Sequence, residues 1–591
     1  LRCVQGMTPE TLRSVRPFVS VSSGKTTRVF PSFETIISTL DFSLIQRYTR
    51  DLDLGRGYKE DRFLGSPGRL TTRLRLNHKR RLQLALTLDK DPGEPLQWAP
   101  GTDTYGFDHV AGSLALRDLG PVKTLILGDF SAQFGQGLTL WQGIRLGKGR
   151  DPVSPVMQSG RGVLPYRSAS EANFFRGTAF TLELATNWAF SAFASRRDRD
   201  ASLDSSLVRG NPSPGPIPVR TISAGGQHRT PSEMARKGTF GETTIGGAVE
   251  YRSSSLHAGA TVYYARFNRP LRPGDTPYRR YRPSGHHTST ISTYATAYLN
   301  QYTLFGEVAR TPNGTIGGLL GGTVDVDDRA QAIVLGRYYP PRLATFYGNA
   351  FGDGGRPQNE IGIYTGLHLR VAEDWTLEAY FDQFQSPWVG FNVPRPATGW
   401  EARTVLTFEP RPWLSTYLQL RAQGQEAGTE HERPSGQLLD GVQLEHRYSA
   451  RWHVEYTFSN ALTIRNRVQL SHQATPSTTA SGFLLSQGLE WSPFTNIDVN
   501  ARLAFFDTQG FAARIYAYER DLLYSFSVPV FFDQGRRSYI LAEYTPLPAL
   551  TLEAKYGITS YAHRSSIGSG LNRIDGSSRR SVGIQVRWTL E

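Results

Sequence analysis

The chain has 591 residues, and its 66 Lys and Arg against 52 Asp and Glu give a net charge of +14. Cys3 has no cysteine partner, which excludes a disulfide scaffold, and no run of about 18 apolar residues exists that could form a membrane-spanning helix. Bulky residues recur along the whole chain, of which 12% is aromatic, so a disordered protein is excluded as well.

The first residues predict a short helix that follows a glycine turn. Gly6 precedes Thr8, which suits the N-cap of a helix that continues to about residue 15. A glycine hairpin followed by a helix can offer backbone N–H groups to a phosphate, and Arg13 and Arg16 could approach the same anion. Both arginines are equally compatible with solvated positions. This segment alone therefore does not predict DNA binding.

From about residue 33 to the C-terminus, apolar and polar residues alternate with a period of two. In Arg81 to Leu88 every second residue is Leu, and Gln83, Ala85 and Thr87 lie between the leucines. Residues 582–590 repeat the pattern, with Val, Ile, Val, Trp and Leu separated by Gly, Gln, Arg and Thr. A strand repeats every two residues and a helix every 3.6. The pattern therefore predicts strands with one apolar and one polar face.

The connections between these strands alternate between long, polar, Pro- and Gly-rich stretches and tight turns. Long outer loops and short inner turns are typical of an outer-membrane barrel, whereas a sandwich has no reason to alternate its loop lengths. The absence of a repeat of about 40 to 50 residues argues against a propeller. We therefore predict an all-β fold: a large antiparallel transmembrane β-barrel of about 24–26 strands, formed by residues 31–591 and located in the bacterial outer membrane.

The connection at residues 133–170 is too apolar for a freely solvated loop. Phe134, Leu138 and Trp141 should pack against protein, and the mouth or interior of the barrel is the expected place. Folded into the lumen, the loop would narrow it and line it with positive charge. The alternative is an extracellular cap whose charges face water or acidic lipopolysaccharide. The basic residues concerned are Arg145, Lys148, Arg150, Arg161, Arg167 and Arg176.

No pattern of catalytic or metal-binding residues stands out. His286 and His287 lie in a polar segment where a histidine pair is more often exposed than a ligand. The chain has no His-x-x-x-His, Cys-x-x-Cys or calcium-loop spacing and no nucleophile elbow. We therefore predict no catalytic residue, no metal site and no cofactor, and expect that the protein is not an enzyme.

Several motifs resemble a known family. They are Gly128-Asp129-Phe130, Phe134-Gly135-Gln136-Gly137-Leu138-Thr139-Leu140-Trp141, Glu171-Ala172-Asn173-Phe174-Phe175-Arg176-Gly177, Arg514-Ile515-Tyr516-Ala517-Tyr518-Glu519 and Ile567-Gly568-Ser569-Gly570-Leu571. Together they look like the large outer-membrane barrels of Bacteroidetes-type bacteria labelled helix-hairpin-helix domain proteins. The resemblance implies that residues 1–30 are the remnant of a periplasmic helix-hairpin-helix segment.

Three functions are compatible with these features. The first is an outer-membrane conduit or binding site for an anionic polymer such as DNA, held by the hairpin and by basic lumen residues. The second is a non-conducting structural or assembly subunit of an outer-membrane complex. The weakest is an outer-membrane hydrolase. The expected partners are outer-membrane lipid and lipopolysaccharide, DNA or another polyanion, and other outer-membrane or periplasmic proteins.

Overall fold

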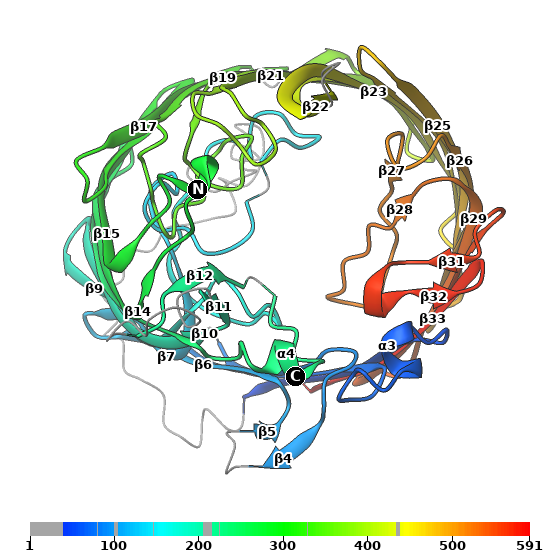
Figure 1. The fold of residues 1–591 in the computed structure, drawn as a ribbon, viewed down its shortest axis with the longest axis horizontal. Helices are drawn as coiled ribbons and strands as arrows, with labels where there is room; N and C mark the ends of the chain where they lie inside the picture. The colour runs from blue at the N-terminus through cyan, green and yellow to red at the C-terminus, as the bar shows by residue number, and fades with distance from the viewer. Residues whose placement is uncertain are drawn as a thin grey trace.

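The computed structural model describes residues 39–590 except 80, 100–103, 146, 205–215, 224, 328 and 433–437. In these residues, 24 antiparallel strands form one closed barrel, which Figure 1 shows as a ring. Neighbours along the chain pair in order, and β33 (Ser578–Leu590) pairs with β1 (Asp41–Asp51) to close the sheet. Closure leaves no free sheet edge, which is the condition for strands to cross a membrane. The predicted fold class and strand number are confirmed.

The remaining wall strands follow in chain order. They are β2 Gly68–His78, β3 Leu82–Lys90, β6 His109–Leu119, β7 Val122–Gln133, β9 Phe175–Ala185, β10 Trp188–Arg199, β13 Phe240–Arg252, β14 Leu256–Leu271, β15 Gly285–Leu299, β16 Tyr302–Arg310, β17 Ile316–Val326, β18 Ala330–Tyr339, β19 Glu360–Ala372, β20 Trp375–Ser386, β21 Ala397–Arg411, β22 Leu414–Glu432, β23 Leu438–Ser459, β24 Leu462–Ala474, β25 Thr479–Phe494, β26 Ile497–Thr508, β29 Gln534–Leu547 and β30 Leu550–Tyr561.

Short elements lie in the connections. The helical ones are α3 (Arg56–Lys59), α4 (Pro231–Met234) and the 3-10 turns η4 (Pro277–Arg279) and η5 (Gly570–Asn572). No helix among the described residues is long and apolar enough to cross a membrane. The expected N-terminal helix, with Gly6, Thr8, Arg13 and Arg16, lies outside the described residues, as does the rest of 1–30. The short strands are β4 Gln97–Ala99, β5 Thr104–Gly106, β8 Gly162–Pro165, β11 Ala201–Leu203, β12 Val219–Ile222, β27 Ile515–Tyr516, β28 Val530–Phe531, β31 Ser566–Ile567 and β32 Ile574–Asp575.

The two ends of the barrel differ as the loop pattern predicted. One end carries tight turns, for example between β6 and β7, between β15 and β16 and between β23 and β24. The long connections at 91–108, 134–174, 200–239 and 509–533 leave from the other end. In outer-membrane barrels the short turns face the periplasm and the long loops face the outside. We use this convention to orient the barrel.

The strands point their apolar side chains outward and their polar side chains inward. Leu320, Val334 and Ile584 lie on the outer face and are 71%, 52% and 52% exposed. On the inner face, by contrast, Asp382 and Gln585 are both 0% exposed. A soluble fold would bury the apolar face instead. The alternation predicted at residues 582–590 is therefore confirmed, and its apolar face is the one available to lipid.

The largest hydrophobic cluster is formed where loops pack against the inner wall at the long-loop end. Phe134 and Leu140 of the 134–174 connection contact this cluster together with Tyr347 of the 340–359 connection. Tyr263 on β14 and Tyr294 on β15 contribute from the wall. In the view of Figure 1 both connections lie within the outline of the ring. Their position brings loop side chains against the polar inner faces of the strands.

Candidate functional site

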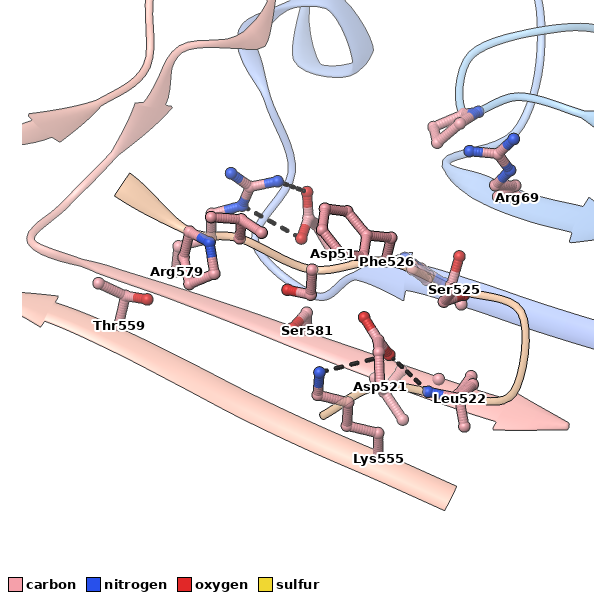
Figure 2. Close-up of a pocket in the computed structure, with 18 of the residues that line it drawn as sticks. Asp51, Arg69, Asp521, Leu522, Ser525, Phe526, Lys555, Thr559, Arg579 and Ser581 are labelled. Carbon is pink, nitrogen blue, oxygen red and sulfur yellow. Dashed lines mark hydrogen bonds and ion pairs between the residues drawn. The ribbon is translucent and has the colours of Figure 1, made fainter. Parts of the chain in front are cut away.

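A cavity of about 860 Å³ lies between the inner wall and the connection 509–533. Its wall side comes from β1, β2, β29, β30 and β33, and its loop side comes from residues 521–532. Figure 1 shows β27 and β28 of this connection inside the ring, and Figure 2 shows the side chains around the cavity. We call it the lumen pocket.

The connection is held against the wall by apolar and ionic contacts. Ile515 and Phe531 join a hydrophobic cluster with Phe506 of β26. Glu519 is buried, and its carboxylate accepts two hydrogen bonds of 2.7 and 2.8 Å from the Arg537 guanidinium on β29. These contacts place residues 521–532 over the cavity. Two short strands, β27 and β28, form within this connection and pair with each other instead of joining the barrel wall.

The lining of the lumen pocket is strongly basic. Seven Arg and Lys side chains line it against two carboxylates, those of Asp51 and Asp521. Figure 2 shows Asp51 bonded to Arg579 and Asp521 bonded to Lys555, at 2.7 and 3.3 Å. The basic lining residues are Arg47, Arg50, Arg69, Arg73, Arg537, Lys555 and Arg579. Both carboxylates are thus engaged by lining residues, so the excess charge of the cavity is positive.

Three of these arginines have no carboxylate ion pair among the described residues. Arg47 donates to neutral groups, namely the Gln585 side chain at 2.7 Å, the Ser525 hydroxyl at 2.6 Å and a backbone carbonyl. The Nε atoms of Arg50 and Arg73 are buried without a hydrogen-bond partner. A buried donor without a partner costs free energy, and an anion in the pocket would supply the missing acceptors.

A second set of such arginines follows the inner wall across β21, β23, β24 and β26. Arg451 on β23 faces Gln469 on β24, and Arg467, two residues before Gln469, faces His453. Neighbouring strands lie about 4.8 Å apart, so these guanidinium groups follow one another across the wall. No member forms an ion pair with a described carboxylate. We call Arg403, Arg451, Arg467 and Arg502 the arginine row.

The hydrogen bonds of the arginine row go to neutral acceptors. Arg403 donates to the Gln419 side chain at 2.9 Å, and Arg451 donates to the Gln469 side chain at 3.0 Å. Arg502 donates to the Tyr518 carbonyl at 2.7 Å. The Nε atoms of Arg403 and Arg467 are buried without a partner. No described carboxylate therefore compensates the positive charge of the arginine row inside the barrel.

The six basic residues predicted on the 133–170 loop and just beyond it do not form one cluster. Lys148 lies against the inner wall, where its ammonium is 2.7 Å from Asp382 and 2.8 Å from Asp353. Burial lowers the pKa of Lys148, but Asp382, Asp353 and Glu401 outweigh burial and raise it above its ordinary value. The charge of Lys148 is thus neutralised by carboxylates of the wall and of a second loop.

The other five lie in four places. Arg150 bonds Glu378 at 3.2 Å, and Arg145 donates to backbone carbonyls of residues 350 and 354. Arg161 and Arg167 line a separate cavity of about 220 Å³. Arg176 on β9 bonds Asp129 at 2.7 Å. The expected single positive constriction is therefore replaced by separate groups, three of which pair with a carboxylate. The sequence could not place the carboxylates opposite Lys148 and Arg150, because Asp353, Asp382 and Glu378 are more than 200 residues away along the chain.

Sequence reasoning missed the lumen pocket and the arginine row. The alternation indicates that Arg451 and Arg467 lie on a polar face, but it does not indicate which acidic residues lie beside them on other strands. Only the strand register shows that neutral Gln and His face them. The signal available in the sequence was that the polar faces of the strands later found as β21–β26 carry Arg and Gln rather than Arg and acidic residues at these positions.

A buried ionic cluster joins three loops at the long-loop end. The Nδ1 atom of His228 lies 2.5 Å from Asp108, and its Nε2 atom lies 2.8 Å from Asp200. The carboxylates of Glu94 and Glu171 belong to the same cluster. Each of two triads, Glu94 with Asp108 and His228, and Glu171 with Asp200 and His228, has its potential ligand atoms within 4.8 Å of one another. Sequence analysis did not single out these residues.

We expect the packing of these loops to weaken as pH rises. Burial and Asp108 raise the pKa of Glu94 to about 7, and burial, Asp108 and Glu94 raise that of Glu171 to about 8. Both values exceed the ordinary 4.5, so the stabilisation is complete below about pH 4.5 and is lost as pH rises through 7 and 8. Burial opposes the charged form of His228, but Asp108 and Asp200 raise its pKa to about 10, so it stays charged over this range.

Hydrogen exchange of residues 91–99 and 104–108, corrected for the intrinsic rate, measures this effect. Protection should be greater at pH 6 than at pH 9 in the wild type. The double variant Glu94→Gln, Glu171→Gln should show equal protection at both values. A wild-type loop that is equally protected at pH 6 and pH 9 would contradict the interpretation.

The closed barrel with a lipid-facing apolar surface and a charged interior is that of an integral protein of the bacterial outer membrane. No protein-family model and no curated protein matches the sequence. Solved structures similar to the fold include the copper transporter OprC, at 10% identity and a TM-score of 0.43 over 93% of this chain and 80% of that one. The siderophore receptor PirA from Acinetobacter baumannii is similar at 8% identity and a TM-score of 0.44, with the same coverages.

Proposed function

We propose that this outer-membrane barrel is a conduit or binding site for an anionic polymer. The observation that carries the proposal is the presence of lumen guanidinium groups, as at Arg73 and Arg451, that have no carboxylate partner in the part of the chain that the structure describes. An arginine stays charged at every physiological pH and can bind a phosphate through two parallel N–H bonds. Such groups concentrate anions in the lumen.

The distribution of the charge favours a polymer over a small anion. Uncompensated arginines lie in the lumen pocket, and others lie in the arginine row on β21–β26. A chain with repeated negative charges can contact several of them at once. DNA is the first candidate, because the resemblance to helix-hairpin-helix proteins implies a phosphate-binding hairpin at Gly6, Thr8, Arg13 and Arg16.

A second candidate function is that of a non-conducting assembly subunit. It is favoured by the loops inside the barrel: the backbone N–H groups of Gln136 and Leu138 bond Glu307 of β16 at 2.7 and 3.1 Å. The Tyr364 hydroxyl on β19 also bonds the carbonyl of Pro152 at 2.7 Å. A lumen closed by such contacts would serve as a scaffold rather than a passage.

Ion selectivity in planar bilayers separates the two candidates. For a conduit we expect an anion-selective reversal potential in a KCl gradient, because the unpaired arginines exclude cations from the lumen. We also expect inorganic polyphosphate to reduce the current from the long-loop side. The complete absence of conductance from correctly folded protein would contradict the conduit and favour the assembly subunit.

A further inference from the structure

A second cavity, of about 640 Å³, lies among the loops at the long-loop end of the barrel. It is formed by the connections 272–284, 340–359 and 387–396 and is distinct from the lumen pocket. Four aromatic side chains line it, together with two arginines. We call it the mouth pocket; the lining residues used below are Tyr278, Tyr281, Trp388, Phe391, Arg282 and Arg356.

The aromatic groups of the mouth pocket are held in defined positions. The backbone N–H of Trp388 donates to the Asn359 side chain at 2.7 Å, and that side chain donates back to the Trp388 carbonyl at 3.0 Å. The indole N–H donates to the Pro277 carbonyl at 2.9 Å. The Tyr281 ring meets the indole edge-on at 5.1 Å between centroids. The pocket is therefore built before any ligand arrives, which reduces the entropy cost of binding.

Phe391 stands at the tip of a tight turn and is 70% exposed. The turn is closed by a hydrogen bond of 2.9 Å from the Gly390 N–H to the Val393 carbonyl. Among the described aromatic groups, only Tyr278 contacts this ring, edge-on with 5.6 Å between the ring centroids. A large apolar ring held out at an outer loop is available to stack on a ligand.

The charge of the mouth pocket is positive. Arg282 stacks over the Tyr278 ring at 5.8 Å, and neither Arg282 nor Arg356 forms an ion pair with any carboxylate that the structure describes. No Asp or Glu lines the pocket. The ligand should therefore carry negative charge.

The polar groups of the pocket argue against a sugar. A sugar ring needs several hydrogen-bonding side chains for its hydroxyl groups, but both atoms of the Asn359 amide are already bonded to Trp388. The Gln358 amide nitrogen donates to the carbonyls of Tyr281 and Pro341, at 2.8 and 2.7 Å. Besides the hydroxyl groups of Tyr278 and Tyr281, what remains is flat aromatic surface and arginine charge, which is the combination that binds unpaired bases beside a phosphate backbone.

We propose that the mouth pocket binds unpaired nucleobases of a single-stranded nucleic acid, with Phe391 and Trp388 contacting bases and Arg282 and Arg356 contacting the adjacent phosphates. The inference rests on the proposed function and specifies its substrate at the point of entry. It assigns recognition of the bases to the mouth pocket, and recognition of the phosphate charge to both the mouth pocket and the lumen.

The test compares a fluorescent 12-residue oligothymidylate with an abasic 12-residue oligomer of the same charge, using the purified full-length protein in detergent and fluorescence anisotropy. We expect the oligothymidylate to bind at least about tenfold more tightly, because base stacking on aromatic side chains contributes on that scale. Phe391→Ala should lower the affinity for oligothymidylate by about tenfold and leave the abasic oligomer unaffected.

Phe511→Ala is the matched control. Phe511 is also exposed, at 54%, and lies beneath the Arg514 guanidinium at 4.4 Å on a different loop, so its removal should change neither affinity. Equal binding of the two oligomers, or an unchanged affinity in the Phe391 variant, would overturn the inference. If either result is found together with anion-selective conductance, the proposed function stands and only the mouth-pocket inference fails. If binding depends on the bases but the conductance is not anion-selective, only the conduit is refuted.

Discussion

Arg337→Met should destabilise the barrel by roughly 3–5 kcal/mol, because it leaves Glu360 buried without its cation and leaves Asp382 paired with Lys148 alone. The guanidinium of Arg337 on β18 bonds Asp382 of β20 at 2.7 and 3.1 Å and also bonds Glu360 of β19. The side chains of Arg337 and Asp382 are fully buried and that of Glu360 is 5% exposed. The measurement is the free energy of unfolding in urea with the protein in lipid vesicles.

The same variant tests whether loops close the lumen. Glu360 accepts hydrogen bonds from the N–H groups of Asp353 and Gly354, at 2.8 and 2.9 Å, and Asp382 bonds Lys148 of the 134–174 connection. Losing Arg337 should loosen both loops and increase the single-channel conductance. The control is the triple variant Arg337→Met, Glu360→Gln, Asp382→Asn, which removes the cation together with both of its carboxylate partners, leaves Lys148 paired with Asp353 and Glu401, and should regain much of the stability. A single variant as stable as the wild type would contradict this account.

The double variant Arg451→Gln, Arg467→Gln should weaken the binding of a polyanion on the order of tenfold at 0.15 M salt, because two contacts with released counterions are lost. The slope of log affinity against log salt should fall by about 1.4 in magnitude for a single-stranded ligand. Both residues lie on the inner wall, and Gln preserves a polar side chain of similar reach. Anion selectivity in planar bilayers should fall in parallel.

The control is the double variant Arg329→Gln, Arg411→Gln, which removes the same number of positive charges elsewhere in the barrel. These two arginines are exposed at the tight-turn end, where β17 joins β18 and β21 joins β22, so their loss should leave the salt slope unchanged. Equal effects of the two double variants would mean that net charge, rather than the arginine row, attracts the polymer.

The alternation of apolar and polar residues was enough to predict the strands and their faces. Leu82, Leu84, Leu86 and Leu88 share one face of β3, and the inner residues between them pair with inner residues of β2. The signal is strong because a strand that touches hydrocarbon on one side and a polar lumen on the other must alternate at every position. Loop lengths then identified the two ends of the barrel.

The candidate site was much harder to predict from the sequence than the strands were. The sequence placed Lys148 on a loop that should pack against protein and assigned it to a positive cluster, but its neighbours Asp382 and Glu401 come from β20 and β21 and neutralise it. A sequence shows which residues carry charge, whereas the sign of the potential in a lumen depends on which charges meet across it. The same limit applies to the uncompensated Arg73 and Arg451.

The amino-acid sequence is enough to show that hairpins with one apolar face run through the chain, and therefore that the chain forms a membrane barrel. The alternation of apolar and polar side chains is a property of neighbouring positions along each strand, so it does not depend on the tertiary structure. The tertiary structure alone decided where the barrel is positive, since closing the sheet and folding the loops inward bring together charges that are distant in the chain. That closure neutralises Lys148, and it leaves the arginine row without a carboxylate partner among the described residues. Coulomb energy depends on distance in space, and strand register sets that distance.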